Sequence, residues 1–65
     1  MKVIVNGAER DVDVVSVEAL VGQLTAARRG VAVAVNGEVV PRSSWAAARL
    51  HDGDRVEVLT AAQGG

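Results

Sequence analysis

Residues 31–40 read VAVAVNGEVV, and this stretch decides how the rest of the chain is arranged. Valine alternates with alanine, which is the period of a half-buried strand, and the branched, stiff side chain of valine suits strands. Asn36-Gly37 can adopt the positive φ values that a tight hairpin turn needs. The stretch therefore predicts a hairpin. Its inward residues are Val31, Val33 and Val35, and its outward residues are Ala32 and Ala34.

Two further stretches have the same two-residue period. Residues 2–14, KVIVNGAERDVDV, predict a second hairpin around Asn6-Gly7. Residues 55–60, RVEVLT, predict a last strand, which follows a turn at HDGD where Gly53 is free to take a positive φ. The inward residues of these strands are Val3, Val5, Val12, Val14, Val56 and Val58.

A helical period marks residues 16–30, SVEALVGQLTAARRG. Ser16 is expected to cap the start of this helix, Arg28 and Arg29 to lie in its last turn, and Gly30 to end it. Residues 43–50, SSWAAARL, predict a short helical turn started by Ser43 or Ser44, in which the ring of Trp45 covers the end of the core. The buried stripe of the long helix is Val17, Leu20, Val21 and Leu24.

The order of elements is hairpin, helix, hairpin, short turn and final strand. A chain of 65 residues with this order forms one domain of the α+β class, in which one helix packs across one face of a mixed sheet. We expect the domain to occupy residues 1–60 and a flexible tail to occupy residues 61–65.

Composition argues against several classes of function. The chain has no cysteine, so disulfides, thiol catalysis and cysteine-ligated zinc are absent, and a reducing cytoplasm is the expected location. The net charge is −1 and Trp45 is the single aromatic residue, which argues against binding nucleic acid. The start of the chain has no long apolar run, so we expect neither a signal peptide nor a membrane span.

No pattern of residues predicts an enzyme. His51 stands beside Asp52 and Asp54, but all three lie in one short turn, from which they cannot easily converge on one metal ion. We interpret His51 as a solvated loop residue and the two aspartates as ordinary turn residues, and we expect no metal site. Arg42, beside Pro41, fits a site for an anion or a partner as well as it fits an ordinary surface position.

The predicted sheet face opposite the helix carries small and aliphatic residues. An apolar patch on adjoining strands is typical of a surface that binds another protein. We therefore predict that this face binds partner proteins. By alternation its residues are Ile4, Ala32, Ala34 and Leu59.

The last five residues, AAQGG, have no charge, no bulky side chain and no β-branched residue. Fully extended, they reach about 17 Å from the domain. Gly64 and Gly65 lack a Cβ, so they can pass through a narrow channel and bring a terminal carboxylate to another protein's active site. In this interpretation ATP converts the carboxylate of Gly65 to an acyl-adenylate, a sulfur nucleophile converts that to a thiocarboxylate, and the chain is a carrier.

The second half of the chain combines VNGEVVPR, Trp45, LHDGDRVEV and a terminal Gly-Gly. With this spacing the chain resembles, over essentially its whole length, the ubiquitin-like sulfur carriers of the β-grasp fold, and most closely the ThiS type of thiamin biosynthesis. The resemblance implies the β-grasp arrangement of the hairpins, helix and final strand described above.

The resemblance also implies partners. A ThiF-type, E1-like adenylyltransferase would activate Gly65 with ATP and Mg²⁺, neither of which this chain would bind itself. Sulfur would come from a cysteine desulfurase or a rhodanese-like protein, and thiazole synthase would take it to form the thiazole of thiamin. Gly64 and Gly65 correspond to the tail that enters the partner's site, and Ile4 and Leu59 to part of the face that partners contact. The free chain is expected to be a monomer.

Three alternatives stay open. The chain could carry sulfur for molybdopterin or cysteine synthesis, although the spacing of VPR and Trp45 and the short length favour thiamin. It could be a protein modifier that is joined to lysines, because the activation chemistry is the same. It could also be a plain binding module that uses the sheet face, in which case removal of Gly64 and Gly65 would leave its function intact.

Overall fold

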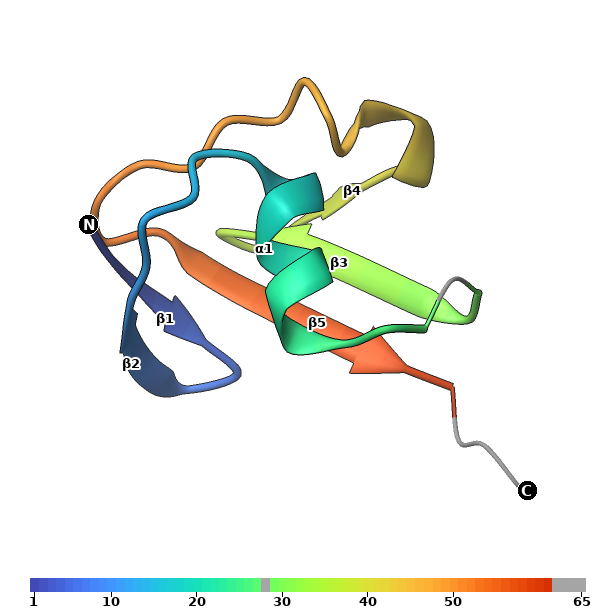
Figure 1. The fold of residues 1–65 in the computed structure, drawn as a ribbon, viewed down its shortest axis with the longest axis horizontal. Coiled ribbons are helices and arrows are strands. Elements are labelled where there is room, and N and C mark those ends of the chain that lie inside the picture. The colour runs from blue at the N-terminus through green and yellow to red at the C-terminus, as the bar shows by residue number, and fades with distance from the viewer. Residues whose placement is uncertain (28, 62–65) are drawn as a thin grey trace.

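A computed structural model describes residues 1–27 and 29–61, and within them five strands form one mixed sheet in the order β2-β1-β5-β3-β4 (Figure 1). The central strand β5 runs parallel to β1 and antiparallel to β3, and the helix α1 lies across one face. The predicted α+β architecture is confirmed. The elements are β1 (Lys2–Val5), β2 (Ala8–Asp11), α1 (Val17–Leu24), β3 (Val31–Val35), β4 (Glu38–Val40) and β5 (Arg55–Thr60).

Two Asn-Gly turns set the pairing within the hairpins. Asn6 and Asn36 have φ values of 49° and 51°, and the glycines that follow them have φ values of 82° and 85°. Positive φ at both central residues is the geometry of a two-residue type I′ turn, whose twist matches that of the paired strands. Each hairpin is therefore joined by its Asn-Gly pair alone.

Both asparagines also connect their hairpins to β5. The Asn6 Oδ1 accepts the Val58 amide at 2.9 Å, and its Nδ2 donates to the Val58 carbonyl at 3.1 Å. The Asn36 Oδ1 accepts the Arg55 amide at 3.0 Å, and its Nδ2 donates to the Asp54 carboxylate at 3.0 Å. The Asn6 carboxamide makes the two hydrogen bonds that a neighbouring strand would make to Val58, because β1 ends at Val5 and pairs with β5 only as far as Val56. The repeated VNG sequence thus serves strand pairing as well as turning.

The core lies between α1 and the covered face of the sheet. Leu20 is the largest of the fully buried side chains in the described chain. Trp45 closes one end of the core, because its ring is buried and its Nε1 donates to the Val40 carbonyl at 2.9 Å, which confirms the predicted packing role. The buried apolar residues are Val3, Val5, Val12, Val17, Leu20, Val21, Val33, Trp45, Leu50, Val56 and Val58.

Strand β2 ends at Asp11, earlier than the sequence predicted, because the chain must leave the sheet edge to reach α1. Val12 still turns inward, and its amide donates to the Met1 carbonyl at 2.8 Å. Val14 packs against the core from an irregular segment. The predicted inward positions of Val12 and Val14 are therefore correct, although the predicted strand extended too far and the real one ends at Asp11.

The start of α1 is confirmed, and the start of the short helical turn is wrong. The Ser16 Oγ accepts the Ala19 amide at 3.2 Å, as expected of an N-cap. The short turn is a 3₁₀ helix, η1 (Arg42–Ser44), which begins after Pro41 rather than at either serine and has no side-chain cap. Pro41 itself is extended, with φ −59° and ψ 147°, and its carbonyl accepts the Ser44 amide at 2.8 Å, so the turn is closed from a residue that precedes both serines.

The predicted end of the long helix is also wrong, because α1 ends at Leu24. Thr25 is extended, with φ −154° and ψ 149°, and its Oγ1 accepts the Ala27 amide at 3.0 Å. A threonine hydroxyl that bonds to neighbouring backbone competes with the helix. Arg29 and Gly30 lie beyond α1, and Arg28 lies outside the described residues.

No helix in the described part of the chain is long and apolar enough to cross a membrane.

Asn6 allows a direct test of the side-chain bridge to β5. The variant Asn6→Gly keeps the freedom for positive φ but leaves the Val58 amide and carbonyl without their partner. We expect the free energy of unfolding, measured in urea, to fall by about 1–3 kcal/mol, which is the cost of unpaired backbone groups. The exposed substitution Ser43→Gly measures the entropic effect of a new glycine alone. Equal losses in the two variants would contradict the bridge.

Candidate functional site

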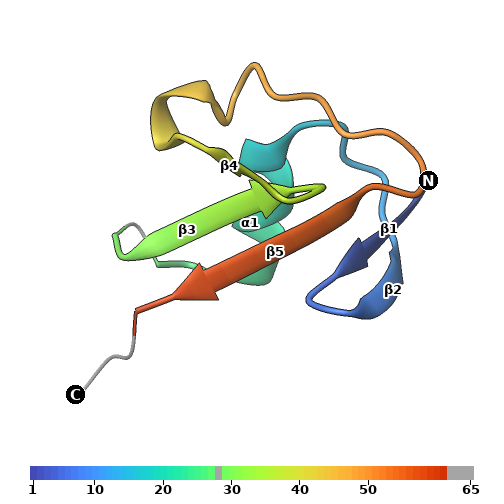
Figure 2. The same cartoon turned by 180° about the vertical axis from the view of Figure 1, so that it is seen from behind.

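The sheet face that α1 leaves uncovered carries a shallow apolar hollow. Figure 2 shows this face, with β3 and β5 in front of α1. The hollow has a volume of about 120 Å³. We call it the outer hollow, and its lining residues are Ala32, Val33, Ala34, Val39, Glu57 and Leu59.

Strand pairing brings three of the four predicted face residues together. Ala32 lies opposite Leu59, and Ala34 lies opposite Glu57 on one side and Val39 on the other. Val39 and Leu59 are 77% and 69% exposed, so two large apolar side chains stand in water on either side of the small alanines. The outer hollow can therefore receive an apolar side chain of another protein.

Ile4, the fourth predicted face residue, lies on the same face but apart from the outer hollow. It is half-buried, and its strand partners are Glu9 on β2 and Arg55 on β5. Leu59 lies further along β5. The face thus has an apolar end at β3, β4 and the end of β5, and a charged end around Ile4.

Val39 was missed in the sequence, although a signal was present. With a two-residue turn at Asn36-Gly37, counting outward pairs residue 35 with 38 and residue 34 with 39. This count puts Val39 beside Ala34 on the outward face, as the structure has it. The alternation within EVV was too short to show the same thing without the register.

Strand β5 leads from the outer hollow toward the predicted tail. The ladder between β3 and β5 runs to the pair Val31↔Thr60, and the Ala61 amide then donates to the Gly30 carbonyl at 2.6 Å. Gly64 and Gly65, the predicted carrier residues, lie outside the described residues. Their roles, and those of Ile4, Ala32, Ala34 and Leu59 in binding, stay predictions.

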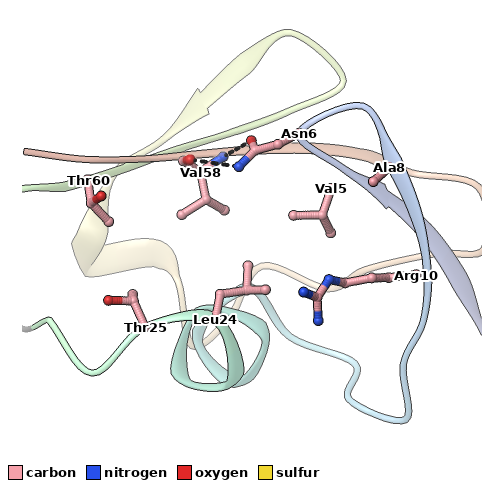
Figure 3. A pocket seen from close by; sticks show the side chains of 8 residues that line it. All are labelled: Val5, Asn6, Ala8, Arg10, Leu24, Thr25, Val58 and Thr60. Atoms are coloured by element: carbon pink, nitrogen blue, oxygen red, sulfur yellow. Dashed lines mark hydrogen bonds between the residues drawn. The ribbon is translucent and has the colours of Figure 1, made fainter.

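A larger open groove, of about 400 Å³, lies on the helix side of the sheet (Figure 3). It exists because α1 ends at Leu24 and leaves the side chains of β2 uncovered. Figure 3 shows Arg10 and Leu24 reaching into this space below Val5. None of the lining residues is His, Cys, Asp or Glu, so the groove offers no general base. They are Val5, Asn6, Ala8, Arg10, Leu24, Thr25, Val58 and Thr60.

The turn that contains His51 connects β1 to the β3–β4 hairpin through hydrogen bonds to its two aspartates. The Asp54 side chain is 14% exposed; one carboxylate oxygen accepts from Asn36 at 3.0 Å and the other from the His51 amide at 2.8 Å. Burial alone would raise the pKa of Asp54, but the hydrogen bonds from Asn36 and His51, with the nearby imidazole, hold it below its ordinary value of 3.8. The Asp52 carboxylate accepts the Lys2 amide at 2.8 Å.

The interpretation of His51 as a solvated loop residue is confirmed, and Asp52 and Asp54 lie in the turn as expected, but Asp54 has a further role. The His51 side chain is 80% exposed, as expected of a solvated residue. Asp54 is instead largely covered and connects the turn to the β3–β4 hairpin. The reason is that Asn36, which sequence analysis assigned to a turn alone, has a second role as a donor.

Arg42 lies over the indole of Trp45, with its guanidinium carbon 5.3 Å from the ring centroid. This is a cation–π arrangement. It gives Arg42 a packing role at the start of η1, a role that was not anticipated from the sequence.

Residues 3–65 match the model of the ThiS family. The match covers nearly the whole chain, including the strands that form the outer hollow. The chain belongs to the ThiS family. Its sheet order and helix position are those expected of the β-grasp fold, and the fold prediction is confirmed by solved structures of ThiS proteins.

Two relatives illustrate this membership. The chain is 36% identical over 50 residues to the sulfur carrier protein ThiS of Escherichia coli K12, which covers 77% of this chain and 76% of the relative. It is 44% identical over 66 aligned positions to a thiazole synthase of Paramagnetospirillum magneticum AMB-1. That alignment covers all of this chain but only 20% of the length of the synthase.

Solved structures of a ThiS thiamine biosynthesis protein from Geobacter metallireducens are similar throughout. The crystal structure superposes with a TM-score of 0.81 at 38% identity and covers both chains completely. The solution structure gives a TM-score of 0.83 at 38% identity and covers 100% of this chain and 88% of the other. The likeness therefore extends to the whole ThiS domain.

Asp54 gives the domain a predictable dependence on pH. Because folding lowers its pKa, the folded state binds this proton less readily than the unfolded state. The resulting stabilisation is complete above the ordinary pKa of 3.8 and is lost as the pH falls through the lower pKa of the folded state. We expect Asp54→Asn to lower the free energy of unfolding by about 1–2 kcal/mol near neutral pH.

The pH series supplies the check on this prediction. The difference between wild type and Asp54→Asn, measured by urea unfolding, should shrink below about pH 4. The substitution Asp13→Asn is the matched control, because Asp13 is exposed and its carboxylate makes no hydrogen bond within the described residues. A difference that stays constant down to about pH 2 would assign the loss to altered geometry instead of charge.

Proposed function

We propose that this chain is a sulfur carrier of thiamine biosynthesis and that the α-carboxylate of Gly65 is the carrier group. The observation that carries the proposal is the family match over residues 3–65, together with a relative named as a sulfur carrier protein. The Gly-Gly end of the sequence agrees with it. The proposal requires a mature chain that ends in a free carboxylate at Gly65, which an intact mass tests.

The proposed chemistry solves a problem of reactivity, because a carboxylate is a poor electrophile. A Gly65 carboxylate oxygen attacks the α-phosphate of ATP, pyrophosphate leaves, and an acyl-adenylate forms. A sulfide-level nucleophile then attacks the carbonyl carbon, and the bond to AMP breaks to leave a thiocarboxylate. The chain itself contributes the carrier group and the binding surface, while a ThiF-type partner with Mg²⁺ and ATP catalyses the activation.

The acceptor in this proposal is thiazole synthase. Its support is the relative of that name in which a segment 44% identical to this chain forms part of a longer protein. Joining two partners in one chain raises their effective concentration, which is useful only when they act together. We further propose a cysteine desulfurase or rhodanese-like protein as the sulfur donor and the cytoplasm as the location. A persulfide on such a donor displaces AMP to give an acyl disulfide with the donor, and a thiol reductant then breaks the S–S bond to release the thiocarboxylate.

The alternatives make different predictions about the acceptor. A carrier for molybdopterin or cysteine synthesis would form the same thiocarboxylate but would not support thiazole formation with thiazole synthase. A protein modifier would form higher-mass conjugates through lysine in a cell lysate. The family match favours the thiamine assignment over both.

The carrier role is tested by intact mass. We expect incubation with the host's ThiF-type enzyme, Mg²⁺-ATP and sulfide to exchange one oxygen for sulfur in the C-terminal peptide. A variant that lacks Gly65 should show no exchange, because its new terminus falls short of the partner's site. No adenylate and no mass change, with an enzyme that is active on another carrier, would contradict activation by this enzyme.

The outer hollow provides a separate test of partner binding. Replacing Leu59 with aspartate (Leu59→Asp) puts a charge where an apolar contact is expected, without touching the core, because Leu59 is 69% exposed. We expect the Kd of the complex with the ThiF-type enzyme, measured by calorimetry, to rise roughly tenfold or more.

Val15→Asp is the matched control for this experiment. Val15 is another exposed large apolar residue, at 52%, but it lies before α1 and outside the sheet. Its substitution should leave the Kd unchanged. If both substitutions weaken the complex equally, or neither does, the outer hollow is not the binding surface.

A further inference from the structure

Gly30 differs from the other glycines with positive φ in the described chain. Gly7, Gly37 and Gly53 lie in turns, and a Cβ built on any of them would meet nothing within 4 Å. Gly30 has φ +70°, and a Cβ built there would lie 2.8 Å from the Cβ of Ala61. A side chain at Gly30 is thus excluded by contact as well as by conformation.

The contact with Ala61 continues the pairing of β3 with β5. The ladder runs from Val35↔Val56 to Val31↔Thr60, and Gly30 and Ala61 are the next positions in the same register. The Ala61 amide donates to the Gly30 carbonyl at 2.6 Å. Because Gly30 has no Cβ, the segments that extend β3 and β5 stay paired for one residue beyond the end of β5.

On its other side, the end of β5 is held by Asn6. The carboxamide of Asn6 pairs with both backbone groups of Val58, as described above. β5 is therefore fixed from both sides just before the chain continues toward Gly65. The four residues after Ala61 span at most about 14 Å when fully extended.

We propose that Gly30 is a positioning residue for the carrier reaction, because it fixes Ala61 as the point from which the carrier end reaches into the activating enzyme. This inference rests on the proposed function. Leu59 in the outer hollow lies only two residues before Ala61, so a partner that binds the hollow finds the exit of the chain at a set distance. Ordering of Ala61 in the free protein lowers the entropy lost on binding.

The test measures adenylation kinetics by ATP–pyrophosphate exchange, with the carrier as the varied substrate. The variant Gly30→Ala should displace Ala61 and raise KM roughly five- to thirtyfold, the factor for ordering the backbone of one more residue, while kcat stays unchanged. In the same variant, hydrogen exchange of the Ala61 amide should become faster. Adding Ala61→Gly removes the clashing atom and should bring KM back toward that of wild type.

Gly37→Ala is the matched control, because it imposes the same positive-φ strain at the other end of β3 without any contact to Ala61. It should leave KM and Ala61 amide exchange unchanged. An equal rise of KM in Gly37→Ala and Gly30→Ala, or no rise in Gly30→Ala, would overturn the proposal. If Gly30→Ala does not fold, Ala61→Pro removes the donated hydrogen from outside the core, and an unchanged KM in that variant would overturn the proposal instead.

Failure of this inference is distinguishable from failure of the proposed function. If wild type supports no exchange with an enzyme that is active on another carrier, the proposed function fails. If wild type supports exchange and the Gly30 variants behave like it, the carrier role stands and only the positioning role of Gly30 is lost.

Discussion

The structure depends on the way β5 is held at the centre of the sheet. It pairs in parallel with β1 and antiparallel with β3, so both hairpins attach to it. The sheet is therefore complete only when the last strand of the chain is in place. Two asparagine side chains extend this attachment to Val58 and Arg55, at positions where the turns have taken the main chain away. Unpaired backbone groups in the middle of a sheet are costly, and these carboxamides satisfy them.

The same strand contributes one face to the core and the other to the outer hollow. The alternation along β5 turns Val56 and Val58 into the core and leaves Leu59 exposed beside the small alanines of β3. One face of the sheet can therefore be fully used for folding while the other stays available to a partner. Because β5 is also the strand that continues toward Gly65, the outer hollow and the proposed carrier group are close along the chain, and the pairing of β3 with β5 continues as far as Ala61.

The features that have a local cause could be predicted from the sequence. Alternating valines, Asn-Gly turns and the Ser16 cap depend on neighbouring residues, and they appear in the structure as expected. The features that were predicted wrongly or not at all depend on distant parts of the chain or on competing local hydrogen bonds. The end of α1 was displaced by the backbone bond of Thr25, and Val39 could be placed only with the register of the hairpin. The groove beside Arg10 follows from the length of α1, which the pattern of apolar residues did not show.

Gly30 shows why a correct local observation can lead to a wrong assignment. A glycine after a run of helix-forming residues is typical of a helix end, because positive φ is needed there, and Gly30 does have positive φ. The same property is needed where two backbones approach closely, and here the approaching residue is Ala61, far away in the sequence. Conformation alone cannot separate the two causes, whereas the contact can. The glycine that was expected to end the helix therefore acts at the other end of the chain, where the domain meets its proposed carrier segment.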